Sequence, residues 1–311
     1  MNPREYSTRS RAPRPAARVA DVMSAAARWQ THGRGRLLAP AALQSWPGIV
    51  HGGALAALLD VASRALAAEE RPRRIEARLT SSVPIERALD LEGHAEGSAV
   101  TVSILEGTQP LTSATITAAA ERPDRDALAA GSPLHARGEP ASDDDGWPMP
   151  RSEQCLACGA DNPLGLQLGL RFDLHGVWAR FEPAPQWRRP DGRLEPALAA
   201  VILDEIAWWL GALVSKEGGL TNRISLALPR PDAPVTGPLL ASGRFDAVTP
   251  VDRRRTFWRT HGCLVGGDGV VLATAEIVFR AGADYSARQM TYFRSRTDPE
   301  VFARMFPAYA G

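Results

Sequence analysis

Residues 48–60 read GIVHGGALAALLD, and this stretch decides the fold. A histidine and two glycines precede an apolar run that is compatible with a helix over 52–68. Asp60 lies within the apolar run, nine positions after His51. The start of a helix carries unpaired N–H donors and the positive end of the helix dipole. The stretch therefore predicts a helix that begins at two glycines and carries a partly desolvated carboxylate. The glycines are equally compatible with a tight turn or with close packing of the helix.

Alternating apolar stretches follow this helix, as expected for antiparallel strands. They lie at 74–83, 89–96, 100–105 and 111–119. The second half of the chain repeats the order, with a helix at 197–214 and strands at 223–228, 239–248, 256–265 and 270–280. Two further expected strands, 166–172 and 177–181, precede that helix. A helix followed by a meander, repeated at a spacing of more than 100 residues, predicts duplication of one α+β domain.

The length of 311 residues, 44% of them hydrophobic, is sufficient for two domains of ordinary size. Residues 121–150 are rich in Pro, Gly, Asp and Ser and have no apolar period, so we expect a mobile linker there. The expected organisation is a disordered leader at 1–15, an N-terminal domain at 16–120, the linker, a C-terminal domain at 151–285, and a tail at 286–311 that adds a short packing helix.

The charge and the apolar segments exclude several classes of partner. A net charge of +1 lacks the basic excess that is typical of nucleic-acid binding. The longest uncharged run, 37–59, contains two prolines and a pair of glycines, so it does not predict a membrane helix. The N-terminus has no apolar stretch that ends at a cleavage site. Three cysteines are too few for a disulfide framework, which favours a reducing, cytoplasmic location. We expect neither nucleic acid nor a membrane as a partner.

The His51-Gly52-Gly53 start, with Asp60 at its spacing, resembles the signature of hotdog-fold acyl-CoA thioesterases of the phenylacetate-pathway type. The second half is similar to another branch of the same superfamily through CLACGADNPLGLQLGLRF (155–172) and LAAVILDEIAWW (198–209). The similar segments span most of the chain outside the leader, linker and tail. The resemblance implies two tandem hotdog domains, each a long helix wrapped by an antiparallel sheet, that form an intrachain pseudo-dimer.

The resemblance also implies a chemistry. A backbone N–H at the helix start polarises the thioester carbonyl, and a carboxylate activates water or attacks. Gly52 and Gly53 are the candidate donors, because the absence of a side chain lets a carbonyl approach. His51 would fix the loop. Asp60 and Asp204 are the candidate carboxylates, because burial raises the basicity of a carboxylate.

The length of the helix decides which half supplies which group. Gly52 and Asp60 are eight positions apart, a rise of about 12 Å at roughly 1.5 Å per residue, too far for both to touch one carbonyl. In hotdog dimers two such helices lie antiparallel, so each site joins the helix start of one domain to the acid of the other. Site A therefore combines Gly52 and Gly53 with Asp204. Site B combines Asp60 with Pro196, which has no N–H to donate, so we expect site B to be degenerate.

Three further positions belong to the expected site. Thr221 stands at the start of the strand after the second helix, where the resemblance implies a hydroxyl that orients water, although a threonine there also suits a turn. An alignment of the two halves on the prolines that end these strands, Pro84 and Pro231, places Arg74 at this position in the first half. Gln44 and Ser45, ahead of the first helix, are the candidates for a second carbonyl donor.

For the other candidate residues the sequence allows two interpretations each. Trp208 suits the wall of an acyl pocket or the core. Arg253 and Arg255 suit the phosphates of coenzyme A or a solvated strand end. A buried acid such as Asp204 is compatible with a catalytic role or with an ion pair to a nearby arginine, for instance Arg223.

The Cys155-x-x-Cys158 spacing supplies half of a zinc site. A second pair of cysteine or histidine ligands at matching spacing does not follow it. The sequence pattern therefore favours a structural role for these cysteines, with no metal and no cofactor.

The function expected from the sequence is hydrolysis of an acyl thioester at a single site between the two domains. The substrate would be an acyl-CoA or an acyl-carrier-protein thioester, and a homo-oligomer of the double hotdog is compatible with the sequence. One alternative is an enoyl-thioester hydratase or dehydratase, which would pair His51 with Asp204. Another is a protein that binds acyl thioesters without catalysis.

Overall fold

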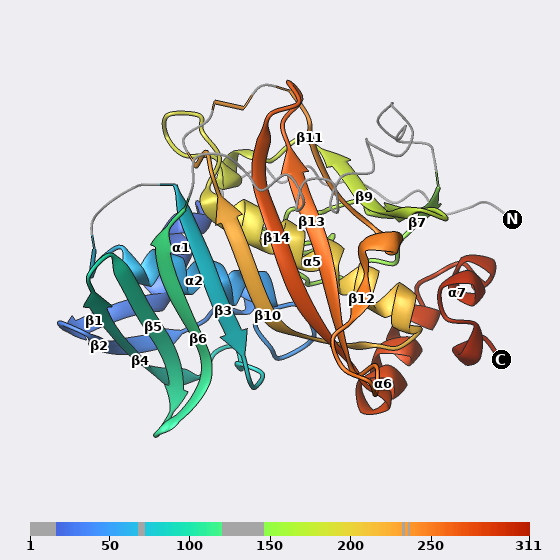
Figure 1. Ribbon diagram of the computed structural model, residues 1–311, viewed down its shortest axis with the longest axis horizontal. Coiled ribbons are helices and arrows are strands. Elements are labelled where there is room, and N and C mark those ends of the chain that lie inside the picture. The colour runs from blue at the N-terminus through green and yellow to red at the C-terminus, as the bar shows by residue number, and fades with distance from the viewer. Residues whose placement is uncertain (1–16, 68–71, 120–145, 232–233, 236) are drawn as a thin grey trace, which may run out of the picture.

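The computed structural model of the protein describes residues 17–67, 72–119, 146–231, 234–235 and 237–311 (Figure 1). The expected leader and residues 121–145 of the expected linker lie outside the described residues. The end of that linker is part of the sheet, because strand β7 (Trp147–Pro148) pairs with β8 (Arg171–Phe172). The sheet of the second half therefore begins before residue 151.

The described strands form one antiparallel sheet in the order β1-β2-β4-β5-β6-β3-β10-β14-β13-β11-β9-β8-β7, and β12 pairs with β13. The first half contributes β1 (Ala27–Thr31), β2 (Arg34–Leu38), β3 (Arg73–Leu79), β4 (Ala88–Glu96), β5 (Ala99–Glu106) and β6 (Gln109–Ala118). Besides β7 and β8, the second half contributes β9 (Gly176–Phe181), β10 (Gly219–Leu228), β11 (Leu239–Arg244), β12 (Thr249–Pro250), β13 (Phe257–Val265) and β14 (Val271–Ala281). The predicted α+β class is confirmed.

The two halves share this sheet through β3 and β10, which pair antiparallel. Side chains reinforce the junction, because Glu76 on β3 accepts hydrogen bonds from Ser225 at 2.6 Å and from Arg223 at 3.1 Å, both on β10. An antiparallel pair at the junction relates the two halves by a local two-fold axis. The predicted pseudo-dimer is therefore confirmed, and its two halves form one continuous sheet.

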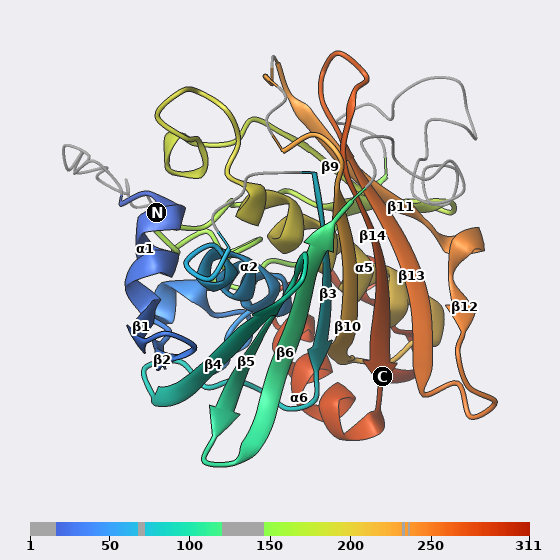
Figure 2. The ribbon, with the colours of Figure 1, turned by 60° about the vertical axis from the view of Figure 1, so that its left-hand side comes forward.

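Two helices, α2 (Gly52–Ser63) and α5 (Pro196–Ser215), lie on one face of the sheet. Figure 2 shows the strands curving around them. The helices contact each other, as predicted: a Cβ atom added to Gly53 would lie 2.2 Å from the backbone oxygen of Ala200. Glycine is required at this position because the two helix backbones approach too closely for any side chain.

Helix α5 is a core helix. By length and composition it is apolar enough to cross a membrane, but 83% of the apolar stretch is buried inside the protein. Pro196 occupies its first position, where the N–H that proline lacks would have no partner within the helix. Lys216, with a left-handed φ of 62°, ends it. The acid Asp204 is thus held in the middle of the longest buried element.

The structure corrects one predicted strand, 166–172. Only its last two residues pair, as β8, whereas the preceding residues form a loop that packs on the cysteine segment. The N–H of Leu166 donates to Leu156 O at 2.9 Å, and that of Leu168 to Ala157 O at 3.0 Å. Leucines occupy alternate positions of this loop, and Leu168 and Leu170 are buried, so the apolar alternation reflects a buried loop and not a strand.

The chain ahead of α2 and the end of α2 also differ from expectation. Helix α1 (Val19–Ala26), β1 and β2 were not predicted, and α2 ends at Ser63, five residues before the predicted end. Ser63 donates its hydroxyl to the backbone oxygen of Asp60 at 2.7 Å, which competes with continuation of the helix. The short 3-10 helices are Ala41–Leu43, Pro185–Trp187, Phe245–Ala247 and Pro307–Tyr309.

The C-terminal segment forms two helices, α6 (Ala283–Arg294) and α7 (Pro299–Met305), where one short helix was predicted. Helix α6 is anchored on the start of β10. Ser286 Oγ accepts from the N–H of Gly218 at 2.8 Å, and Gln289 Oε1 accepts from the N–H of Gly219 at 2.8 Å. Because β10 carries Thr221, the tail helps to position the site described next.

Candidate functional site

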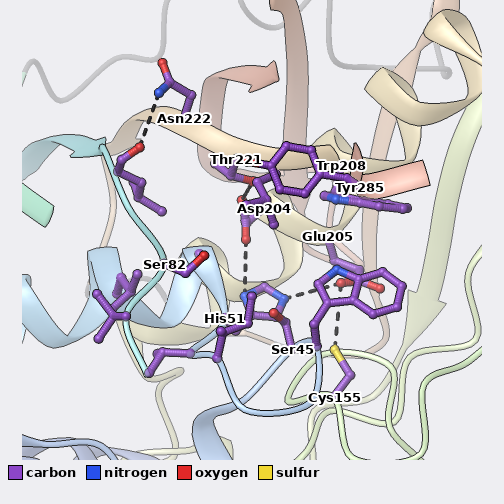
Figure 3. Close-up of a pocket in the computed structure, with 18 of the residues that line it drawn as sticks. Ser45, His51, Ser82, Cys155, Asp204, Glu205, Trp208, Thr221, Asn222 and Tyr285 are labelled. Atoms are coloured by element: carbon purple, nitrogen blue, oxygen red, sulfur yellow. Dashed lines mark hydrogen bonds and ion pairs between the residues drawn. The ribbon is translucent and has the colours of Figure 1, made fainter. Parts of the chain in front are cut away.

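The start of α2 meets the carboxylate of Asp204 on α5, so the two halves of the chain meet at one point (Figure 3). Gly53 donates its backbone N–H to Asp204 Oδ2 at 2.7 Å. Gly52 leaves room for this carboxylate, because a Cβ atom there would lie 2.7 Å from the same oxygen. The structure thus brings together Gly52, Gly53 and Asp204.

The two glycine N–H groups have different roles. The N–H of Gly53 is engaged by Asp204 and is not free for a substrate oxygen, which corrects its expected role as an oxyanion donor. Gly52 lines the pocket, and within the described part of the chain its N–H has no hydrogen-bond acceptor. An N–H in the first turn points out of the helix end, where the dipole is positive. Gly52 is therefore the available donor, and Gly53 positions the acid.

Thr221 lies on the other side of the same carboxylate. Its hydroxyl donates to Asp204 Oδ1 at 2.6 Å. Asp204 is buried, and burial raises the pKa of this carboxyl above its ordinary value, against the charge of His51 and the hydrogen bonds from Thr221 and Gly53. A fixed carboxylate of raised basicity is the kind of group that accepts a proton from water.

His51 caps α2 and connects Asp204 to Glu205. Its Nδ1 lies 3.2 Å from Asp204 Oδ2 and 3.1 Å from the nitrogen of Gly53, and its Nε2 lies 3.3 Å from Glu205 Oε2. The N–H of Gly53 is closer to Asp204, so we assign Nδ1–H as a donor to that carboxylate; in this protonation state Nδ1 does not accept a hydrogen bond from Gly53. Burial lowers the pKa of His51, but hydrogen bonds with Cys155 and Glu205 and the charge of Asp204 raise it well above its ordinary value. Both ring nitrogens are engaged.

The cysteine segment forms the next part of the wall. Cys155 Sγ lies 3.9 Å from Glu205 Oε2, and Trp209 donates its indole N–H to the other oxygen, Oε1, at 3.3 Å. A hydrogen bond with Cys158 lowers the pKa of the Cys155 thiol to about 7, against burial and the charge of Glu205. Cys155 is therefore the more acidic thiol of the pair, and hydrogen bonding to Cys155 raises the pKa of Cys158 well above its ordinary value.

These groups line one pocket between the halves. Ser45 and Trp208, both predicted, line it, and Trp208 donates its indole N–H to Gly219 O at 2.9 Å. The indole ring also packs within 6.0 Å of Trp46, centroid to centroid. Aromatic rings of Trp46, Trp208, Trp209, Tyr285 and Phe293 together form much of the wall. The pocket thus has an aromatic wall beside a carboxylate.

Three predicted contacts lie elsewhere. Gln44 is not among the pocket-lining residues, and its side-chain oxygen accepts from the N–H of Gly48 at 3.4 Å. Arg253 and Arg255 are exposed on the turn before β13 and also lie outside the pocket lining. The arginine that lines the pocket is Arg280 on β14, and this residue is exposed to solvent.

The acid of the first half is in a different environment. Asp60 is buried and forms ion pairs with Arg64 at 2.8 Å and Arg73 at 2.9 Å. Pro196 lines a small separate pocket whose lining does not include Asp60. Glu195, which precedes Pro196, pairs with Arg18 at 2.9 Å. The arrangement around Asp60 suits structural stabilisation and not proton transfer.

Two predicted arginine contacts are corrected. Arg73, and not Arg74, makes the contact to Asp60 Oδ1 that Thr221 makes to Asp204 Oδ1. Arg74 instead contacts Glu76 and Ser225 on the exposed side of the sheet. Arg223, a sequence candidate for pairing with a buried acid, pairs with Glu76. The shift of one position arose because the strands were aligned on prolines beyond their ends.

Sequence reasoning missed Glu205, Arg280 and the contribution of Cys155 to this site. Glu205 directly follows Asp204, and a second acid within an apolar run is a signal that was available. Arg280 ends β14 with no sequence feature to distinguish it from other strand-end arginines. Cys155 reaches His51 only through the tertiary fold.

No protein-family model matches the sequence, and no curated protein matches it. Solved structures do match. A hotdog-fold protein of unknown function from Alicyclobacillus acidocaldarius superimposes with a TM-score of 0.58 at 15% identity, covering 85% of this chain and 97% of that one. A protein from Thermobifida fusca YX, provisionally assigned as a thioesterase II, gives 0.58 at 13% identity, covering 84% and 99%.

An N-terminal dehydratase from the difficidin assembly line also matches, with a TM-score of 0.50 at 11% identity, covering 85% of this chain and 98% of that chain. Identities this low establish the shared fold, while the catalytic chemistry follows from the side chains of each site. The likeness spans both halves and agrees with the helix pair, the shared sheet and the β3–β10 junction. The chain is therefore a double hotdog: two hotdog domains fused in tandem into a pseudo-dimer.

Proposed function

We propose that the protein hydrolyses an acyl thioester at the site between α2 and α5. The observation that carries this proposal is that the Gly52 N–H and the Asp204 carboxylate, from opposite halves, line one pocket. Acyl transfer to water needs a donor for the developing oxyanion and a base for the attacking water, and these two groups supply both.

The hydrogen bonds around Asp204 define how a water would be held. Thr221 gives its hydroxyl proton to Asp204, so its oxygen can only accept a further hydrogen bond. A water that donates one hydrogen to Asp204 and the other to Thr221 presents its lone pair outward. The water oxygen attacks the thioester carbon, Asp204 takes the proton, and the tetrahedral intermediate collapses with loss of the thiolate. Asp204 then gives this proton to the thiolate, which leaves as the free thiol, and the carboxylate is restored.

The start of α2 would stabilise the intermediate. The carbonyl oxygen becomes an oxyanion as water adds, and the Gly52 N–H sits at the positive end of the helix dipole. Gly52 has no side chain to obstruct the approach of the carbonyl. His51 and Gly53 fix the carboxylate next to this helix end. Their Nδ1 and backbone nitrogen lie 3.2 Å and 2.7 Å, respectively, from Asp204 Oδ2.

The apolar and the charged side chains that line the pocket suit the acyl group and the coenzyme of an acyl-CoA, respectively. The aromatic wall of Trp46, Trp208 and Phe293 offers apolar surface for the acyl group. Arg280 offers an exposed guanidinium for the phosphates of the coenzyme, because a guanidinium forms strong hydrogen bonds with phosphate. An acyl-carrier protein presents its phosphopantetheine arm with the same thioester chemistry.

Hydration of an enoyl thioester is the second candidate, since His51 and Asp204 come from opposite halves and lie 3.2 Å apart. That chemistry needs an imidazole nitrogen free to exchange a proton with the substrate. Here Nδ1 faces Asp204 and Nε2 faces Glu205, so the arrangement favours hydrolysis.

The test is a panel of acyl-CoA thioesters assayed by release of free thiol, with Asp204→Asn as the blank. Enoyl-CoA substrates are included and followed separately by loss of enoyl absorbance. Thiol release that depends on Asp204 supports the proposal. Enoyl hydration without thiol release would identify a hydratase, and saturable binding without either reaction would identify a binding protein.

A further inference from the structure

Three side chains from distant parts of the sequence direct donor atoms at one point in the wall of the pocket (Figure 3). His51 Nε2, Cys155 Sγ and Glu205 Oε2 all lie within 4.8 Å of one another. His51 and Cys155 are buried, and the side chain of Glu205 is 12% exposed. They come from the cap of α2, from the loop before β8, and from α5. The proposed hydrolysis uses none of these three donor atoms.

The spacing of the donors fits a tetrahedral metal ion. Bonds of about 2.0–2.3 Å from zinc to nitrogen, oxygen and sulfur place neighbouring ligand atoms roughly 3.3–3.8 Å apart. The observed separations are 3.3 Å from His51 Nε2 to Glu205 Oε2 and 3.9 Å from Cys155 Sγ to the same oxygen. A small movement of the side chains would complete the geometry.

The loop that carries Cys155 is shaped to present its sulfur. The N–H of Ala157 donates to Cys155 Sγ at 3.3 Å, which favours the thiolate form that binds metals. The N–H of Gly159 donates to Cys155 O at 2.9 Å and closes the turn. A Cβ atom at Gly159 would lie 2.4 Å from Cys155 O, so the turn requires glycine there.

The neighbours of the three donors orient them as partners of metal ligands usually do. Histidine ligands commonly donate their second ring N–H to a carboxylate, and His51 Nδ1 lies 3.2 Å from Asp204 Oδ2. Trp209 binds Glu205 Oε1 at 3.3 Å, which leaves Oε2 directed at His51 and Cys155. Each of the three side chains therefore has a further contact that holds it in place.

A divalent cation would also balance the negative charges of the Cys155 and Glu205 side chains. A thiolate from Cys155 and a carboxylate from Glu205 repel each other in a buried position, where water screens them weakly. A doubly positive ion would neutralise both, with His51 as a neutral ligand. Mixed nitrogen, sulfur and oxygen donors at tetrahedral spacing favour zinc over magnesium or calcium, which prefer oxygen donors alone.

We propose that His51, Cys155 and Glu205 form a zinc-binding site that ties the cysteine loop of the second half to the start of α2. Cys158 lines the same pocket, three positions after Cys155, but among the described residues the donors that lie within 4.8 Å of one another are His51, Cys155 and Glu205. The ion would fix the ring of His51 and thereby the cap of the helix that presents Gly52. The site does not depend on thioester hydrolysis.

Zinc and cobalt binding to the full-length protein tests the proposal. Reduced protein is loaded with Zn²⁺, dialysed and assayed for metal, and Co²⁺ is titrated in a parallel experiment. We expect one zinc per chain, and a cobalt complex with visible bands of tetrahedral geometry and a thiolate-to-cobalt band in the near ultraviolet. Cys155→Ser and Glu205→Gln should each weaken binding by at least about 100-fold, the upper range for loss of an outer-shell partner alone.

Cys263→Ser is the matched control, because Cys263 is also buried but contacts Ser242 in the sheet. This variant should bind zinc as the parent does. Thermal melts identify any variant that fails to fold, and the cobalt spectrum of the parent does not depend on variants. Absence of stoichiometric metal in the reduced parent, or parental affinity in Cys155→Ser, would overturn the proposal. Because no substrate is present, failure of the proposed hydrolysis would leave these results unchanged.

Discussion

Gly53 and Asp204 are 151 positions apart in the chain, yet the backbone N–H of one lies 2.7 Å from the carboxylate of the other. A hydrogen bond to a charged group contributes about 1.5–3 kcal/mol, so this contact both stabilises the domain junction and fixes the acid. It holds Asp204 next to Gly52, whose N–H stays available. A change to either residue should therefore affect the site across the junction.

Replacement of Asp204 by asparagine should lower kcat/KM by about 10²–10⁴-fold, the range that general base catalysis spans. Asparagine preserves the size of the side chain but does not take a proton from water. Thiol release from the best acyl-CoA substrate measures the effect. Thermal melts alongside the parent separate loss of chemistry from loss of folding.

Asp60→Asn should give the opposite pattern. Most of the activity should remain, because Asp60 is bound by Arg64 and Arg73 and has no part in the pocket. The free energy of unfolding should fall by on the order of 3 kcal/mol, because buried Arg73 loses its charged partner. A stable but inactive Asp60→Asn protein, together with an active Asp204→Asn protein, would place the working site in the other half.

Thr221→Val should lower kcat by about 10–100-fold, the equivalent of a lost hydrogen bond to a charged group at roughly 1.5–3 kcal/mol. Valine keeps the shape of threonine and removes the hydroxyl that holds water and Asp204. Thr221→Ser restores the hydroxyl and should restore most of kcat. Steady-state kinetics at saturating substrate make the comparison, and an effect on KM alone would contradict a role in orienting water.

Alanine at the two glycines should separate catalysis from packing. At Gly52 the three atoms nearest to the added Cβ all belong to the carboxylate of Asp204, the closest at 2.7 Å, so we expect a folded protein with a displaced acid and little activity. At Gly53 the Cβ meets backbone atoms of Ala200 and Val201 at 2.2 and 2.7 Å. The helices must then move apart, which should cost about 1–3 kcal/mol of stability. Denaturant unfolding and activity of both variants test the contrast, and equal stability would argue against it.

Arg280→Ala should raise KM for acyl-CoA by up to about 10-fold, since a charge-assisted contact contributes about 1.5 kcal/mol. Its kcat should be unchanged, because the hydrogen bonds that position Asp204 come from Gly53 and Thr221 and not from Arg280. Thioesters of N-acetylcysteamine lack the coenzyme phosphates and serve as the control substrate. Arg253→Ala, outside the pocket, is the control variant, and an equal effect of both variants on KM would indicate general electrostatic attraction instead.

Cleavage of the chain between the halves should leave them associated. The β3–β10 strand pair and the contact of α2 with α5 do not depend on the connecting segment. A protease site placed between residues 121 and 145 and cut under native conditions should give one peak of unchanged volume on size exclusion. Two separate peaks would mean that the shared sheet is weaker than its hydrogen bonding indicates.

The parts of this fold that follow local rules were predictable from the sequence. Both core helices and most strands agree with apolar periodicity. The rise of a helix excluded a common site for Gly52 and Asp60, and the resemblance to hotdog dimers predicted that the start of the first helix contacts Asp204. The prediction of a strand at 166–172 was wrong because a buried loop can show the same apolar alternation as a strand. The periodicity of apolar residues indicates which side chains are buried. It indicates backbone pairing between strands only where the chain is also extended.

The contacts that distinguish the site depend on residues far apart in the chain. Arg73 neutralises Asp60 because β3 passes beside α2, and a shift of one position in a sequence alignment assigns that contact to Arg74. His51, Cys155 and Glu205 come from three segments, so no ligand spacing in the sequence unites them. Glu205 was identifiable only as a second acid in an apolar helix.

In a dimer of identical chains, one codon specifies both copies of a site, so an arginine beside one acid is an arginine beside both. The β3–β10 junction keeps the geometry of such a dimer while each half is encoded separately. Arg73 beside Asp60 and Thr221 beside Asp204 illustrate the result: one carboxylate serves as a structural anchor and its counterpart stays basic. Covalent fusion thus lets mutation change the surroundings of one carboxylate while those of its counterpart stay as they are.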